Sequence, residues 1–177
     1  NHVLAGVGIG RGSRMKAVRD ARGILGGVVD PHAAFLLDRG IKTLGVRMGQ
    51  HNANALAVAR YLEAHPAIER VYYPGLPSHP DHKVAKKQMN GFGGMLAFEL
   101  GSLEAARRLL NNVKLHALAE SLGGVESLIS HPATMTHASV PADRRAAIGI
   151  TDGLMRISAG VAHLDDLQDS LTPAPDT

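Results

Sequence analysis

Residues Gly153–Gly160 read GLMRISAG, which places an arginine in the middle of an otherwise apolar stretch. The pattern predicts a strand over residues 155–159, with Arg156 near its centre. A half-buried guanidinium needs an anionic partner, because otherwise the free energy lost in removing its charge from water is not compensated. An acidic side chain of the same chain would make Arg156 structural. A ligand carboxylate that accepts two parallel hydrogen bonds from the guanidinium would make Arg156 a binding residue. The residues alone leave both possibilities open.

A second polar stretch, ESLGGVESLISHPATMTH, covers residues Glu120–His137. Ser121 precedes Gly123 and Gly124, so that a hydroxyl and exposed backbone N–H groups occur in one turn. Such a turn is suited to binding a small anion. It is equally typical of an ordinary turn whose glycines adopt positive φ angles.

The rest of the chain alternates between short helical and strand patterns. Helical periodicity is expected over residues 13–22, 32–65, 82–88, 102–110, a short stretch after Pro141, and 164–171; strands are expected over 3–9, 68–73, 95–100, 113–118, 125–129 and 155–159. The strands are short and the connections between them are brief, which predicts an α/β fold with an open sheet and helices on one side. The 3–9 segment predicts a buried strand at the amino terminus, which would need neighbours that these residues do not supply.

The composition of the 177 residues, 45% apolar and 20% charged, is that of a globular protein. With no apolar run of bilayer length and no secretory signal pattern, we expect a cytoplasmic protein without a membrane segment. The chain has no cysteine, which excludes disulfides and thiolate chemistry. Its net charge is only +3 and only 3% of its residues are aromatic, so nucleic acid is not an expected partner.

Two further motifs permit a functional interpretation beside a structural one. Glycines in GVGIGRG, residues 6–12, could let backbone N–H groups approach a phosphate, but their spacing fits neither the dinucleotide nor the P-loop pattern, so a structural turn is favoured. The pairs His79/His82 and His131/His137 lack a nearby third ligand. No metal site is therefore expected.

Four segments resemble the carboxyl-terminal part of the pyridoxal-phosphate (PLP) enzymes of Cys/Met metabolism, which include cystathionine γ-synthase, cystathionine γ-lyase and methionine γ-lyase. They are LGGVVDPHAAFLLDRGIKTLGVRM, HPAIERVYYPGLPSHPDHKVAKKQMNGFGGMLAFEL, ESLGGVESLISHPATMTH and GITDGLMRISAGVAHLDDL. The resemblance implies a fold-type I PLP-dependent transferase architecture. Residues 1–47 would be the end of the large PLP-binding domain and the start of a linking helix. Residues 48–177 would be the small carboxyl-terminal domain, with an open, mostly antiparallel sheet.

The resemblance also assigns roles to individual residues. Ser121, Thr136 and Arg156 match the family residues that line the site for the α-carboxylate of the substrate. Glu120 matches an acid of the cystathionine-type members, where it could recognise the distal ammonium group of the substrate. The implied activity is γ-elimination or γ-replacement on cystathionine- or homoserine-derived amino acids, and a β-lyase is the alternative within the family.

One family feature is absent from the sequence. Relatives bind PLP through a lysine in a Ser-x-Thr-Lys motif, which does not occur in this chain, so no catalytic residue is expected here. We therefore expect a separate amino-terminal polypeptide to carry that lysine and most PLP contacts. This polypeptide would be either a second gene product or the piece released by a cut just after that lysine. The two pieces would form a hetero-oligomer, a dimer or tetramer of assembled units. The alternative outside enzymology is a regulatory or structural subunit of the same fold.

Overall fold

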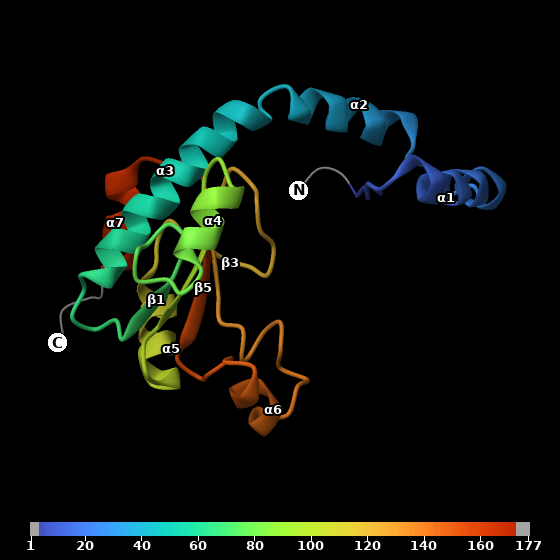
Figure 1. Ribbon diagram of the computed structural model, residues 1–177. Coiled ribbons are helices and arrows are strands. Elements are labelled where there is room, and N and C mark those ends of the chain that lie inside the picture. Colours follow the sequence, from blue (N-terminus) through green and yellow to red (C-terminus); the bar gives the residue numbers. More distant parts are fainter. Residues whose placement is uncertain (1–3, 173–177) are drawn as a thin grey trace. The chain divides into compact units, whose positions relative to one another are not determined.

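The computed structural model describes residues 4–172, which separate into two compact units that meet in sequence between Gly45 and Val46. The first unit holds helices α1 (Gly12–Leu25) and α2 (Pro31–Ile41), seen in blue in Figure 1. Helix α2 begins as its sequence dictates: Pro31 occupies the first turn, and the Asp30 carboxylate accepts hydrogen bonds from the backbone N–H groups of His32 and Ala33, both at 3.0 Å. The division of the chain into the end of a large domain and a small domain stays a prediction.

One prediction for this part of the chain is wrong. Residues 4–9 form no strand and are exposed, because the described residues offer no neighbouring strand to pair with their backbone N–H and C=O groups; residue 3 lies outside the described range. The helical pattern over residues 32–65, in which Gly40, Gly45 and Gly49 mark places for a kink or joint, forms two helices, α2 and α3 (Leu44–Glu63), with Lys42 and Thr43 in the turn between them. Thr43 bonds back to the Gly40 carbonyl, and so its hydroxyl competes with helical hydrogen bonding at this break.

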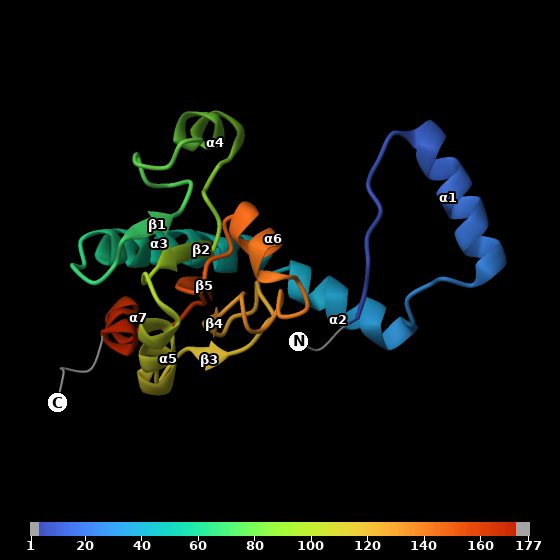
Figure 2. The same cartoon turned by 90° about the horizontal axis from the view of Figure 1, so that it is seen from below.

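The second unit is built on a five-stranded sheet. Its strands are β1 (Arg70–Tyr72), β2 (Met95–Glu99), β3 (Ala117–Leu118), β4 (Leu128–Ser130) and β5 (Leu154–Ser158), in the spatial order β1-β2-β5-β4-β3 (Figures 1 and 2). All neighbours are antiparallel except β3 and β4. The remaining helices are α4 (His82–Gln88), α5 (Leu103–Asn112), α6 (Ala142–Ala147) and α7 (Leu164–Leu171). The predicted open, mostly antiparallel sheet is therefore confirmed.

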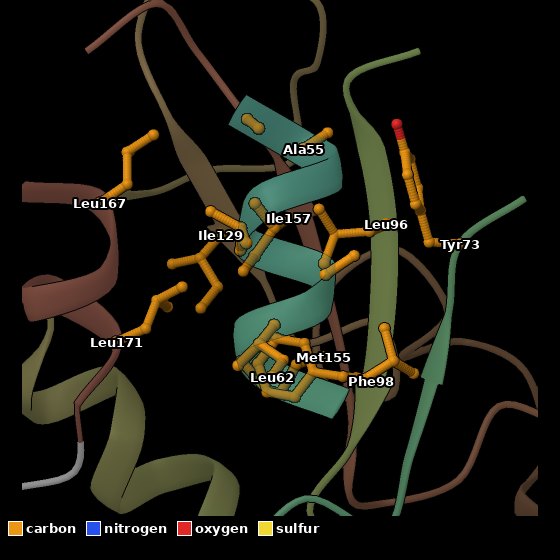
Figure 3. Close-up of a cluster of buried hydrophobic side chains, with 14 of the residues drawn as sticks. Ala55, Leu62, Tyr73, Leu96, Phe98, Ile129, Met155, Ile157, Leu167 and Leu171 are labelled. Atoms are coloured by element: carbon orange, nitrogen blue, oxygen red, sulfur yellow. The ribbon is translucent and has the colours of Figure 1, made fainter. Parts of the chain in front are cut away.

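The hydrophobic core lies between one face of this sheet and α3, together with residues of α5 and α7. Figure 3 shows Leu96, Ile129 and Ile157 from three neighbouring strands directed toward the same cluster as Ala55 and Leu62 of α3. Ile129 and Ile157 are fully buried, and each contributes roughly 1.5–3 kcal/mol through burial of its side chain. The sheet is thus held on one face by apolar packing.

A buried polar contact joins α7 to the segment before β3. Ser170 Oγ accepts hydrogen bonds from the backbone N–H groups of Lys114 (3.3 Å) and Leu115 (3.1 Å), so its own hydroxyl proton is free to be donated to His116 Nδ1 at 3.1 Å. His116 is 4% exposed, and its Nε2 is a buried atom without a hydrogen-bond partner among the described residues. Burial lowers the pKa of His116 from 6.5 to about 4, so the imidazole is neutral at pH 7.

We expect the free energy of unfolding to fall as the pH is lowered from 6.5 toward 4, because in this window unfolded His116 binds a proton that the folded protein excludes. The slope contributed by one such group is at most about 1.4 kcal/mol per pH unit. Denaturant titrations of wild type and His116→Gln at pH 7 and pH 5 measure it. His116→Gln should lose this part of the pH dependence, and His32→Gln, an exposed histidine, should keep it. An equal pH dependence in His116→Gln and wild type would contradict the assignment.

Candidate functional site

Arg156 lies at the centre of the central strand, β5. Met155 and Ile157 on either side of it are fully buried on the core face, so the alternation of a strand directs Arg156 to the opposite face. In register, Arg156 stands beside Ala97 of β2 and Ser130 of β4. The apolar packing of α3 against the sheet therefore fixes the position of a charged group on the other side.

The guanidinium of Arg156 is bound to backbone carbonyls. Nη2 donates to the carbonyl of Glu120 at 2.6 Å and to that of Ser121 at 3.3 Å. No carboxylate within residues 4–172 forms an ion pair with it, and its Nε is buried without a hydrogen-bond partner there. The described residues therefore orient the positive charge but do not neutralise it.

The loop that supplies these two carbonyls is held by the end of β5. Ser158 Oγ accepts a hydrogen bond from the Gly123 N–H at 2.9 Å, and Ser127 Oγ accepts one from the Gly160 N–H at 2.8 Å. Gly123 has φ 77°, a left-handed conformation in which a side chain would be strained. The glycine pair thus serves a real positive-φ turn, and the same turn lies against Arg156. Sequence reasoning did not identify Ser158 and Ser127 as the residues that anchor it.

Helix α3 fixes the segment that follows β5. His51 Nδ1 lies 2.6 Å from the Ala159 carbonyl and donates to it, and Asn54 Nδ2 donates to the Gly160 and Ala162 carbonyls, both at 2.9 Å. His51 and Asn54 are buried polar residues. They occur at helical spacing in GQHNANA, residues 49–55, and this run of polar residues on a buried helix was a signal that sequence reasoning missed.

The segment with Thr136 is fixed through a different residue, His131. This histidine is 2% exposed, its Nε2 lies 2.9 Å from the Asp152 carbonyl, and its Nδ1 lies 2.8 Å from Thr134 Oγ1. Because a carbonyl only accepts, Nε2 carries a proton and donates it to the Asp152 carbonyl, and Nδ1 shares a hydrogen bond with the threonine hydroxyl. The carboxylate of Asp152 in turn accepts from Arg145 of α6 at 3.2 Å. His131 thereby ties the segment before Thr136 to the turn that begins β5.

The structure brings together three of the four predicted substrate-binding residues. Arg156 contacts the backbone of Glu120 and Ser121, whereas the Thr136 hydroxyl lies 2.8 Å from His137 Nδ1 and is exposed. The Glu120 side chain is exposed as well. Within residues 4–172 no group of three His, Cys, Asp or Glu residues is arranged to hold a metal ion. Nor is any helix there long and apolar enough to cross a bilayer.

Residues 1–174 match the family described as Cys/Met metabolism PLP-dependent enzyme. The chain belongs to this family. It is 54% identical over 153 residues to cystathionine gamma-lyase of Dictyostelium discoideum, covering 86% of this chain and 40% of that protein. It is 52% identical to cystathionine beta-lyase of Coxiella burnetii, covering 85% of this chain and 39% of the relative.

A solved structure agrees with both the family and the fold. It is the crystal structure of cystathionine gamma synthase from Xanthomonas oryzae pv. oryzae in complex with aminoacrylate and cysteine, with a TM-score of 0.79 and 48% identity, covering 84% of this chain and 38% of that one. The fold-type I prediction is confirmed. The chain spans about 40% of the length of these relatives.

The site of this chain does not contain the groups that would hold PLP covalently. Neither residues 120–137 nor strand β5 contains a lysine. Lys16 lies on the exposed surface of α1 and Lys42 in the exposed turn after α2, where they pair with Asp20 at 2.7 Å and Asp38 at 3.0 Å. The guanidinium of Arg156, a planar donor of several N–H groups, fits a carboxylate instead. We therefore assign no cofactor contact to these residues.

Proposed function

We propose that this chain supplies the α-carboxylate site of a PLP-dependent enzyme that performs γ-elimination or γ-replacement on cystathionine- or homoserine-derived amino acids. The observation that carries the proposal is the state of Arg156, whose charge is fixed by two carbonyls and paired with no acid of the described chain. A substrate carboxylate would complete this environment with charged hydrogen bonds worth about 1.5–3 kcal/mol each. The relatives named cystathionine gamma-lyase and cystathionine gamma synthase support the proposed γ-chemistry.

The proposed division of labour follows from what each residue touches. Arg156, Ser121 and Thr136 bind and orient the carboxylate. The rigid sheet thus holds the substrate by a group that lies away from the bonds that react. The exposed carboxylate of Glu120, next to this site in sequence, recognises the distal ammonium group of a cystathionine-like substrate. When bound, PLP supplies an electron-withdrawing ring that stabilises negative charge on the substrate carbon atoms.

We further propose that the cofactor lysine is carried by a separate amino-terminal polypeptide. The Ser-x-Thr-Lys motif is missing from the 177 residues. Exposed apolar side chains of the first unit, among them Val18, Ile24 and Phe35, offer an apolar surface that such a partner would cover. The assembled enzyme would be a dimer or tetramer of such pairs, as a hetero-oligomer.

A β-lyase is the second candidate, because relatives of nearly equal identity are named cystathionine beta-lyases. Product analysis separates the two reactions. Acting on cystathionine, a γ-lyase releases cysteine, and a β-lyase releases homocysteine.

We expect the native protein to show the visible absorption band of lysine-bound PLP, and cystathionine to change this band when it binds. Intact-mass analysis of every chain in the same sample tells where the lysine lies. A second chain with a Ser-x-Thr-Lys motif would support the split enzyme. A single longer chain that contains both the motif and these 177 residues would contradict the split and show one continuous enzyme. A protein that contains only the 177-residue chain and lacks the band would contradict the proposed activity and favour a structural or regulatory subunit.

A further inference from the structure

Five buried side-chain polar atoms lack a hydrogen-bond partner among the described residues: His51 Nε2, His116 Nε2, Ser130 Oγ, Arg145 Nε and Arg156 Nε. Buried polar groups are rarely left unpaired, because each such group loses its hydrogen bonds to water without replacement. Two of the five belong to residues that stand opposite each other. These are Ser130 and Arg156, which are paired in register across β4 and β5.

Residues in register on antiparallel strands direct their side chains to the same face, with Cβ atoms about 4.5–5.5 Å apart. Ser130 is 0% exposed, so bulk water does not reach its hydroxyl. On the other side, Arg156 is in register with Ala97, whose methyl group offers no polar atom. Among its in-register neighbours, Ser130 is therefore the one that can serve the Nε–H of Arg156.

We propose that Ser130 is a positioning residue for Arg156: the two side chains form no direct hydrogen bond, and one buried water accepts the Nε–H and donates to the Ser130 hydroxyl oxygen. The chemistry of the two groups matches, since Nε can only donate and a serine hydroxyl both accepts and donates. This water bridge satisfies both unpaired atoms at once. The inference deepens the proposed function, because it states how the carboxylate-binding arginine is held.

Together with the existing contacts of Nη2, this water bridge would fix the guanidinium from two sides. Nη2 is already held by the carbonyls of Glu120 and Ser121, and Nε would be held by β4. With its plane locked, the remaining N–H groups point in a defined direction before the ligand arrives. Less conformational freedom is then lost on binding, and the affinity for a carboxylate rises.

The first test needs no ligand. Hydrogen exchange of the Arg156 Nε–H, followed by NMR in the ligand-free protein, should be about three- to ten-fold faster in Ser130→Ala than in wild type, as expected for the loss of one hydrogen bond. Ser130→Thr, which keeps the hydroxyl, should restore slow exchange. Ser170→Ala removes another buried serine hydroxyl, far away in sequence on α7, and should leave this resonance unchanged. Equal exchange in wild type and Ser130→Ala would overturn the proposal.

The second test measures KM and kcat of the assembled holoenzyme separately. Ser130→Ala should raise the KM for the amino-acid substrate about three- to ten-fold with little change in kcat, and Ser130→Thr should rescue it. In an Arg156→Ala background the same substitution should have no further effect, since the hydroxyl acts through the arginine. Additive effects of the two substitutions would overturn the proposal. If Arg156→Ala leaves the KM unaltered while the exchange result holds, the carboxylate role of Arg156 fails and the Ser130 contact stands.

Discussion

Arg156→Ala is expected to lower kcat/KM of the assembled enzyme by about 10²–10⁴-fold, because it removes two charged hydrogen bonds to the substrate carboxylate. Arg156→Lys keeps the charge but loses the planar fork and the contacts to the Glu120 and Ser121 carbonyls, so most of the loss should remain. Steady-state kinetics with cystathionine measures both variants.

A matched control separates loss of binding from loss of fold. Arg145 is also a partly buried arginine with an unpaired Nε, but it forms an ion pair with Asp152 at 3.2 Å. Arg145→Lys should therefore lower the free energy of unfolding and have only a small effect on kcat/KM. If Arg156→Ala and Arg145→Lys had the same kinetic effect, Arg156 would be a structural residue.

Gly160→Ala is expected to destabilise the protein by about 2–3 kcal/mol, a cost typical of overpacking against atoms that cannot move. A methyl group at this position would overlap the Val125 carbonyl oxygen and fall 2.7 Å from the backbone nitrogen of Ser127. Relief would require separating the end of β5 from the loop that carries Ser121. The same substitution should therefore raise the KM for the substrate. Thermal denaturation and kinetics give the two readouts.

Gly49→Ala is the control for this prediction. A methyl group there would meet no atom within 4 Å, and the residue lies inside helix α3. Alanine is favoured over glycine in a helix by about 1 kcal/mol, so this variant should be unchanged or more stable. Similar losses of stability in both variants would show that the close approach at Gly160 is not responsible.

The sequence predicted most of the second unit because its elements have local signals. Helix α7 was expected over residues 164–171 and is found there, and a helix was expected from Ser102, which caps α5 by accepting from the Ala105 N–H at 3.2 Å. Strand β3, expected over 113–118, contains only Ala117 and Leu118. It is a short edge strand, and what limits it is pairing with β4, which no local pattern encodes.

The site was predictable in residue type but not in contacts. An arginine in an apolar strand signals a buried charge, and this much is visible in GLMRISAG. Its partners are the backbone carbonyls of Glu120 and Ser121, and carbonyls are available at every residue, so no side-chain pattern marks them. The same holds for the Nε2 contact of His131, which depends on the fold bringing the Asp152 carbonyl next to it.

The most direct test of the carboxylate role of Arg156 is a crystal structure of the assembled enzyme with a bound amino-acid substrate or unreactive analogue. The account predicts that the α-carboxylate accepts hydrogen bonds from the Arg156 guanidinium, with Ser121 and Thr136 beside it. A carboxylate bound elsewhere, with Arg156 still bonded only to protein carbonyls, would contradict it.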